Sequence, residues 1–202
     1  MPDELIPTRA TLLQRLKNWQ DQSSWQDFFD TYWNLIYGVA RKGGLTPAEA
    51  EDVVQDTMVS VAKHMPGFKY DPAIGSFKGW LLKVTRWRIV DQLRKRHGQS
   101  LPEEASLDEV DLDEIAEVAD PELEKIWEAE WEGNLLNVAT AKARRRLDPQ
   151  HYQIFDCYVN KEWSPDKISK IFSVSVGQVY LAKHRVTEAI RLEVERLKNE
   201  MI

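Results

Sequence analysis

Helical periodicity is the feature that most restricts what this chain can fold into. Apolar residues return every three or four positions along most of its 202 residues, and no Asn-Gly or Asp-Gly pair joins two alternating runs. Hydrophobic residues make up 43% of the sequence, which is enough to fill a core. We therefore predict an all-α fold.

Local start and stop signals divide this pattern into helices. The stretch TPAE at residues 46–49 offers a capping threonine, a proline for the first helical position and a glutamate that can complete a capping box. It predicts a helix that runs to about Met65, before a Pro-Gly stop. Upstream we expect one helix from about Thr8 to Trp19 and another from about Ser24 to Lys42, which a Gly-Gly pair ends.

The net charge of −6 conceals an uneven distribution. Residues 61–102 hold nine Lys/Arg and two Asp/Glu, a net +7, whereas residues 103–132 hold one Lys and fourteen Asp/Glu, a net −13. Residues 133–202 return to +4, and residues 1–60 carry −4. Two basic regions on either side of an acidic one indicate contacts with nucleic acid, which the average charge would argue against.

The basic segment at residues 75–96 carries two apolar stripes when it is drawn as a helix. One is aromatic and the other aliphatic: Trp80, Val84 and Trp87 against Leu82, Ile89 and Leu93. We expect one stripe to face a core and the aromatic stripe, edged by lysine and arginine, to stack with unpaired bases. The alternative is that both tryptophans are core residues and the cations form a solvated face.

The stretch before this helix adds further aromatic and basic side chains. Phe68, Lys69, Tyr70 and Phe77 follow the Pro-Gly stop within a few residues of one another. Such a group can frame a pocket for a base that has left its stack.

The C-terminal region predicts a helix-turn-helix. A short helix, SPDKISKIF, begins at Ser164-Pro165, and Ser175 with Gln178 repeats the capping-box pattern at the start of the next helix. That helix has an apolar face and an opposite polar face: Val179, Ala182, Val186 and Ile190 against Gly177, Tyr180, Leu181 and His184, with Lys183 and Arg185 at the margins. A recognition helix of this kind enters the major groove with its N-terminal residues nearest the bases.

Enzyme chemistry has little support in the sequence. His64, His97, His151 and His184 lack metal-ligand spacing, and no Gly-rich phosphate loop or G-x-S-x-G motif occurs. Cys157 lies in an apolar helical setting typical of a core residue. We expect no enzyme activity, no cofactor and no metal.

Location is predicted by elimination. The first residues lack an unbroken apolar run, so we expect no secretory signal, and no later stretch is apolar enough for a membrane span. With one cysteine, no disulfide can form within the chain. We therefore expect a cytoplasmic protein.

The composition predicts two small helical domains joined by an acidic linker. Residues 97–120 are acidic with irregularly spaced apolar residues, which is typical of a segment with little structure of its own. Helical signals resume at Asp120-Pro121. The predicted division is residues 1–96, the linker 97–120, and residues 121–202.

These segments together resemble the sigma factors of bacterial RNA polymerase, in the extracytoplasmic-function (ECF) class of the sigma-70 family. AEDVVQDTMVSVAKH is similar to the polymerase-binding helix of region 2, and FKYDPAIGSFKGWLLKVTRWRIVDQLRKR to the segment that opens and reads the promoter −10 element. WSPDKISKIFSVSVGQVYLAKHRVTEAIRLEVERL is similar to region 4, which reads the −35 element. The resemblance covers about residues 8–96 and 121–198.

The resemblance implies a polymerase-binding face on the helix of residues 47–65. Its apolar stripe is expected to face the core, and a second set points away from it: Asp52, Gln55, Asp56 and Val59. The implied partners are the clamp coiled coil of the polymerase β′ subunit and the β flap. Without the resemblance, a solvated acidic surface would be the simpler interpretation.

Two DNA-binding sets follow from the same resemblance. The implied −10 set is Phe68, Lys69, Tyr70, Phe77, Lys78, Trp80, Lys83, Arg86, Trp87, Arg88, Arg94 and Lys95. The implied −35 set is Ser175, Gly177, Gln178, Tyr180, Leu181, Lys183, His184 and Arg185. One departure is that Arg86 is followed by Trp87, where the family usually has asparagine, so the contact of that asparagine is not carried over.

The implied function is transcription initiation: binding core RNA polymerase, recognising the −10 and −35 elements of promoter DNA, and assisting melting. An anti-sigma factor is a further candidate partner. The acidic linker is expected either to occupy a positively charged channel of the polymerase or to remain unbound. The alternative function is a conventional helix-turn-helix regulator that binds duplex DNA without polymerase, with residues 1–96 as a dimerisation or effector domain.

Overall fold

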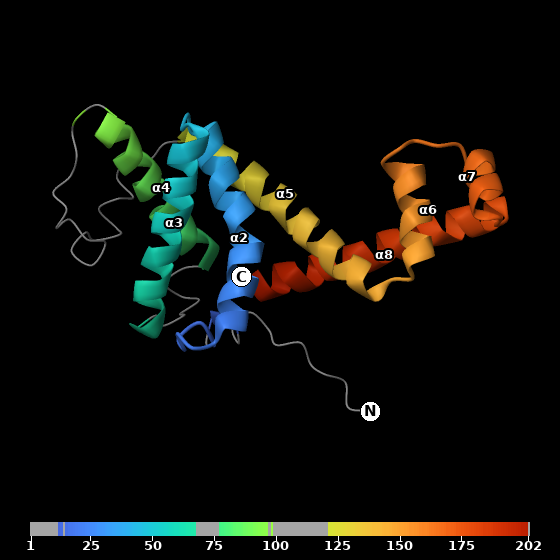
Figure 1. Ribbon diagram of the computed structural model, residues 1–202, viewed down its shortest axis with the longest axis horizontal. Helices are drawn as coiled ribbons and strands as arrows, with labels where there is room; N and C mark the ends of the chain where they lie inside the picture. The colour runs from blue at the N-terminus through green and yellow to red at the C-terminus, as the bar shows by residue number, and fades with distance from the viewer. Residues whose placement is uncertain (1–11, 14, 68–76, 97, 99–120, 202) are drawn as a thin grey trace. The chain divides into compact units, whose positions relative to one another are not determined.

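The computed structural model describes residues 12–13, 15–67, 77–96, 98 and 121–201 (Figure 1). Every regular element in this part of the chain is helical, so the expected all-α fold is confirmed. The predicted linker at residues 97–120 lies, apart from Gly98, outside the described residues.

The chain divides into two compact units. The first is Met1–Asn134 together with Glu200–Ile202, and the second is Leu135–Asn199. The boundary falls inside one helix, α5 (Pro121–Arg146), whose first half therefore belongs to the first unit. This division differs from the domain boundary expected at residue 121. The functional assignment of the domains stays a prediction.

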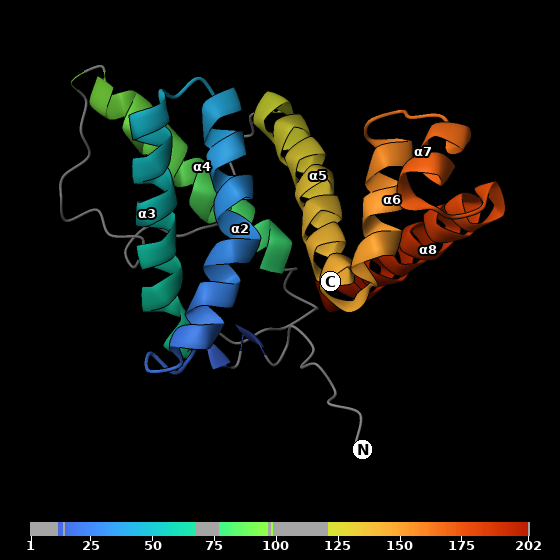
Figure 2. The same cartoon turned by 45° about the vertical axis from the view of Figure 1, so that its right-hand side comes forward.

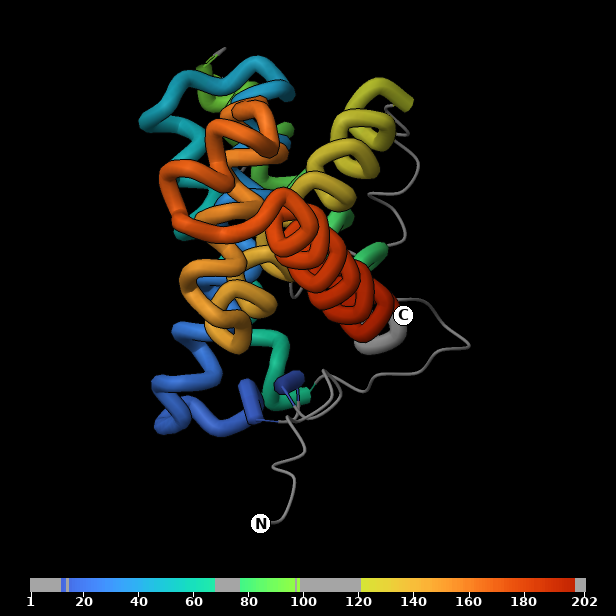
Figure 3. Tube along the Cα trace, turned by 90° about the vertical axis from the view of Figure 1, so that its right-hand side faces the viewer, coloured from blue at the N-terminus to red at the C-terminus, as the bar shows by residue number. Residues whose placement is uncertain are grey.

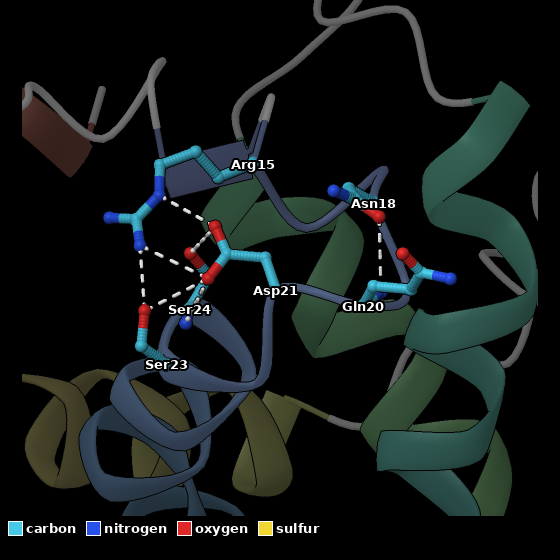
Figure 4. Close-up of polar contacts among 6 residues, drawn as sticks. All are labelled: Arg15, Asn18, Gln20, Asp21, Ser23 and Ser24. Carbon is cyan, nitrogen blue, oxygen red and sulfur yellow. Dashed lines mark hydrogen bonds and ion pairs between the residues drawn. The ribbon is translucent and has the colours of Figure 1, made fainter.

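α2 (Gln22–Lys42) begins two residues before the predicted start because Asp21 caps it. The Asp21 carboxylate accepts hydrogen bonds from Arg15 Nε at 2.9 Å, from Ser24 N at 3.1 Å and from the hydroxyls of Ser23 and Ser24 (Figure 4). These bonds, the one from Arg15 above all, hold the pKa of Asp21 well below its usual range. The chain therefore reaches α2 through a fixed turn.

The helix expected at residues 8–19 lies partly outside the described residues, which lack residues 8–11 and 14. Leu12, Leu13 and Arg15 are helical, but the following residues form turns, so the expected end at Trp19 is wrong. The physical reason is that Asn18 N and Asp21 N donate to carbonyls three residues earlier. These turn bonds replace the continued helical pattern.

α3 (Pro47–His64) starts as predicted. Thr46 Oγ1 accepts from Glu49 N, and the Glu49 carboxylate accepts from Thr46 N at 2.7 Å, so both halves of the capping box form. Before it, Gly44 has a φ of 90°, a conformation that favours glycine. The helix gives way to a 3-10 turn, η1 (Met65–Gly67).

The core of the first unit lies between α2, α3 and α4 (Phe77–Arg96), and Figure 2 shows α2 and α3 side by side. Its buried side chains include Phe28, Tyr32, Ile36, Val53, Val61, Phe77, Leu81 and Ile89. The ring centroids of Phe28 and Phe77 lie 6.0 Å apart in an edge arrangement, which joins α2 to the start of α4.

The first half of α5 completes the first unit. Trp127 is fully buried, Trp131 is 6% exposed, and the Trp131 ring lies 6.2 Å from that of Tyr32. Asn134 Nδ2 donates a hydrogen bond to the carbonyl of Thr31 at 2.8 Å. Residues 121–134 are therefore attached to α2 by both apolar and polar contacts.

The second unit holds the second half of α5, α6 (Pro149–Val159), α7 (Pro165–Phe172) and α8 (Val176–Met201), and Figure 3 follows the trace through them. A small buried core joins the last three helices: Ile154, Cys157, Ile168, Val179 and Ala182. Ser173 ends α7 with a φ of 53°, a left-handed cap that turns the chain into α8.

Candidate functional site

The outer face of α3 carries acidic and amide groups around one exposed apolar side chain. Asp52 and Gln55 are exposed, and Val59 is 51% exposed. On the opposite face, Ala50 and Val61 are fully buried. An exposed valine among polar groups can be covered by a partner, because burying it removes apolar surface from water.

Asp56 lies closer to the core than the other three residues of this face. It is half-buried, and its charge acts on Arg88 of α4, which donates from Nη2 to Ser60 Oγ at 2.7 Å. Burial lowers the pKa of Arg88, while Asp56 and Asp91 oppose that effect. Asp56 therefore helps to hold α4 against α3.

The exposed aromatic stripe expected on α4 is wrong. Val84 is buried, Trp87 is only 8% exposed, and Phe77 and Arg86 are buried as well. In the expected aliphatic stripe Ile89 is buried, but Leu82 and Leu93 are only partly so. The reason is that α2, α3 and α5 all contribute contacts to α4, so it buries more than one side.

Arg88 does not extend freely into solvent either. Its guanidinium carbon lies 4.5 Å from the centre of the Trp87 ring, and it is bonded to Ser60 as described. This arrangement uses its charge inside the protein. The expected role of Arg88 on a DNA-facing surface is therefore not supported by its packing.

Other members of the implied −10 set keep some exposure. Lys78, Trp80 and Lys83 are half-buried, and the Trp80 ring lies 5.6 Å from Phe77. At the end of α4, Arg94 and Lys95 are exposed, and Lys95 Nζ pairs with Asp91 at 2.9 Å. The remaining members, Phe68, Lys69 and Tyr70, lie outside the described residues.

Acidic residues of α5 pair with two basic residues of α4. Glu128 Oε2 lies 2.6 Å from Lys78 Nζ, and Glu124 Oε1 lies 3.8 Å from an Arg86 nitrogen. Lys78 Nζ also lies 5.2 Å from the centre of the Trp131 ring. Sequence reasoning missed this pairing. The signal for it was the net charge of −13 over residues 103–132, which include residues 121–132 of α5.

The start of α8 presents all eight residues of the implied −35 set to solvent: Ser175, Gly177, Gln178, Tyr180, Leu181, Lys183, His184 and Arg185. The capping box forms, with Ser175 N donating to Gln178 Oε1 at 2.7 Å and Gln178 N donating to Ser175 Oγ at 3.2 Å. Val179, Ala182 and Val186 are fully buried on the opposite face. The exposed face is thus held rigidly by its buried counterpart.

Side chains of α6 and the turn before α7 border this exposed face. The Tyr158 ring lies 5.9 Å from that of Tyr180, and Lys183 Nζ lies 5.7 Å from the centre of the Tyr158 ring. In the turn before α7, the centre of the Trp163 ring lies 3.8 Å from Nζ of Lys167, a residue of α7. Sequence reasoning did not single out Tyr158 because its position on α6 gave no motif.

Parts of the chain are similar to a known family model and to known proteins. The model of sigma-70 region 2 matches residues 28–98, which include most of α2 and all of α3 and α4. The ECF RNA polymerase sigma factor SigK of Mycolicibacterium vanbaalenii is 28% identical over 99 residues, 49% of this chain and 50% of SigK. SigE of Mycolicibacterium smegmatis, another ECF sigma factor, is 24% identical over 188 residues, 92% of this chain and 67% of SigE.

The chain therefore carries a region similar to sigma-70 region 2 and is similar to two ECF sigma factors. Its relatives confirm the resemblance to the ECF class that the sequence motifs carried. The match to SigK extends over only half of that relative's length. The region 2 model ends before α5, so the helix that covers part of α4 lies outside the matched residues.

The described residues contain neither a cluster suited to a metal ion nor a helix suited to a membrane. Within residues 12–13, 15–67, 77–96, 98 and 121–201, no group of three or more His, Cys, Asp or Glu is placed to hold a metal ion. Among the helices of this same part of the chain, none is both long and apolar enough to cross a membrane.

Proposed function

We propose that this chain is a transcription initiation factor that binds core RNA polymerase and directs it to promoters with −10 and −35 elements. The sigma-70 region 2 match over residues 28–98 is the observation that carries the proposal. The match includes α3 and α4 and so supports the proposal that these two helices contact polymerase and the −10 element.

The proposed polymerase-binding residues are Asp52, Gln55 and Val59, with Asp56 at the edge of the face. Val59 supplies exposed apolar surface, and the acidic and amide groups around it suit a basic helical partner. The clamp coiled coil of the β′ subunit is that partner in this proposal. Because Asp56 also acts on Arg88, its substitution would disturb α4 as well as the interface.

The proposed −10 contacts form a smaller set than the sequence suggested. The half-buried or exposed residues Lys78, Trp80, Lys83, Arg94 and Lys95 remain candidates, along with residues 68–70. Arg86 is buried but keeps one guanidinium nitrogen without a hydrogen-bond partner, so it stays a candidate for a phosphate. Cations serve the phosphate backbone, and Trp80 can offer a ring edge or face to a base. The buried residues Phe77 and Trp87 instead support the shape of α4.

The proposed −35 contacts are the eight residues of the implied −35 set, which are exposed at the start of α8. Their position at the N-terminal end of the second helix of a helix-turn-helix is where base edges are read in the major groove. Lys183 and Arg185 can serve phosphates or guanine, and Gln178 is held by the capping box. The β flap is the proposed polymerase partner of this unit.

The proposal is tested by gel filtration of the chain with bacterial core RNA polymerase. The wild type should co-elute, whereas Val59→Asp should not, because a buried carboxylate at the centre of the face would lack a partner. Leu136→Asp is a matched control, since Leu136 is 52% exposed, close to the 51% of Val59, and lies on α5. It should co-elute like the wild type.

The alternative function gives a different pattern. A conventional helix-turn-helix regulator would not co-elute with polymerase in any of the three forms and would shift duplex DNA by itself. A wild-type chain with that behaviour would overturn the proposal. Equal co-elution of Val59→Asp and wild type would instead show that the polymerase contact does not lie on this face of α3.

A further inference from the structure

We propose that residues 121–134 of α5 form an acidic cover over α4 that competes with promoter DNA for Lys78 and Arg86 and must move when DNA binds. This inference rests on the proposed function, because it assumes that the basic side of α4 meets a DNA strand. It adds a regulatory contact within the first unit.

The carboxylates of the cover lie on the solvent side of the cations. Glu128 is 61% exposed while its partner Lys78 is 26% exposed, and Glu124 is 55% exposed while Arg86 is 7% exposed. A DNA phosphate that approached these cations from solvent would meet the two glutamates first. The cover therefore presents negative charge where a DNA strand would present its own.

Arg86 is poorly satisfied by its present partner. Its nearest carboxylate oxygen lies at 3.8 Å, which is beyond hydrogen-bond distance, and its Nη2 is buried without a hydrogen-bond partner. A buried guanidinium with an unused N–H donor is stabilised when a closer anion accepts a hydrogen bond from it. The oxygens of a phosphate suit the geometry of a guanidinium. The pair with Glu124 is thus one that a phosphate can replace.

Apolar contacts, more than charges, hold the cover in place. Trp127 and Trp131 are buried, and Asn134 bonds to the Thr31 carbonyl, whereas the ion pairs are exposed on the glutamate side. Exposed ion pairs contribute little to stability. The tryptophans therefore position the cover, and the glutamates supply the negative charge that competes with DNA phosphates.

A removable cross-link tests whether the cover must move. A Cβ built on Gly38 would clash with Glu130 Oε2 and would lie 3.2 Å from its Cδ and 3.8 Å from its Cγ, so position 38 faces the Glu130 side chain directly. We therefore use a Gly38→Cys/Glu130→Cys chain, in which the shorter cysteine replaces the glutamate that this Cβ would meet, and oxidise it to a disulfide. The native Cys157 is buried in the second unit and does not compete for this bond. The disulfide would lock α5 to α2, and a reductant would release it in the same sample.

The readout is the binding of a fluorescent single-stranded DNA to the full chain at low salt, measured by anisotropy. We expect the oxidised form to bind about tenfold more weakly than the reduced form, because the phosphate contacts that supply the affinity are blocked. The single variants Gly38→Cys and Glu130→Cys should respond to neither oxidant nor reductant.

A charge-matched pair of variants gives a second measurement. Glu124→Gln/Glu128→Gln should bind the same DNA more tightly than wild type, because the competing charges are gone and the tryptophans remain. Asp27→Asn/Glu51→Gln removes the same charge from two exposed positions of the first unit outside the cover and should bind more nearly like wild type.

Equal DNA binding by the oxidised and reduced double-cysteine forms would overturn the inference. So would the absence of DNA binding in both forms, because the cover would then compete with nothing. Co-elution with core polymerase is scored separately. A chain that co-elutes but binds DNA equally in the oxidised and reduced forms would support the proposed function and contradict only the acidic cover.

Discussion

Arg88 of α4 and Ser60 of α3 are joined by a hydrogen bond of 2.7 Å between Nη2 and Oγ. Ser60 is itself 1% exposed, and its hydroxyl donates onward to the carbonyl of Asp56 at 2.7 Å. A side chain first interpreted as DNA-facing thus anchors α4 to the helix that carries the proposed polymerase face.

Ser60→Ala should destabilise the first unit by about 1–3 kcal/mol, because it leaves a half-buried guanidinium without its hydrogen-bond acceptor. Urea unfolding followed by circular dichroism measures the change. A double-mutant cycle with Arg88→Ala should return a coupling energy of about 0.5–3 kcal/mol. Additive effects of the two substitutions would show that the bond contributes nothing.

The Glu49–Arg96 pair predicts a pH-dependent stability. Arg96 Nε donates to Glu49 Oε1 at 3.0 Å and Arg96 Nη2 donates to Oε2, and this bonding is the main reason that the pKa of Glu49 falls to about 2 from 4.5. A lowered pKa in the folded state stabilises it above pH 4.5, and that contribution is lost as the pH falls from 4.5 towards 2.

Glu49→Gln should therefore lower the urea midpoint at pH 7, and its difference from wild type should shrink at pH 3. Glutamine can still complete the capping box, so the variant isolates the charge pair with Arg96. Glu51→Gln serves as the control on the same helix, because Glu51 is exposed. A difference that stayed constant with pH would contradict the assignment to Glu49.

Arg185→Ala should weaken the binding of a polymerase complex to promoter fragments that contain a −35 element by about 1–3 kcal/mol. Arg185 is exposed at the margin of the proposed reading face, so the fold should be unaffected. Lys198→Ala removes a cation from an exposed position further along α8 and is the control. Equal losses in the two variants would indicate only a general charge effect.

Trp127→Ala should lower the stability of the first unit by about 3–5 kcal/mol, because the fully buried indole leaves a cavity. Trp19→Ala is the comparison, since Trp19 is 60% exposed and stacks on Trp25 at 5.5 Å. Its loss should cost less than about 1.5 kcal/mol. Unfolding curves followed by circular dichroism compare the two. A Trp127→Ala effect as small as that of Trp19→Ala would remove the anchor assigned to the cover.

Local sequence signals predicted the helix starts well. The capping boxes at Thr46 and Ser175 depend on side chains three residues apart, so no distant contact is needed to recognise them. The buried face of α8 was predicted for the same reason, since Val179, Ala182 and Val186 repeat at helical spacing and pack on a single side.

The packing of α4 could not be predicted in the same way. Periodicity identifies apolar positions but not the number of helices around them, and Trp87 is buried because neighbouring elements enclose the helix. The course of residues 121–134 was hidden for a related reason. Their charge indicated an acidic segment, while the pairing of Glu128 with Lys78 depends on tertiary contacts fifty positions apart.

Cys157, the single cysteine of the sequence, is 5% exposed in the core that joins α6, α7 and α8. Only an accessible thiolate reacts quickly with alkylating reagents, so modification has to wait until these helices separate. The rate of labelling in the unmodified chain therefore measures how often the helix-turn-helix opens. The Cys157 thiol is thus a native probe of local opening in the core that joins α6, α7 and α8.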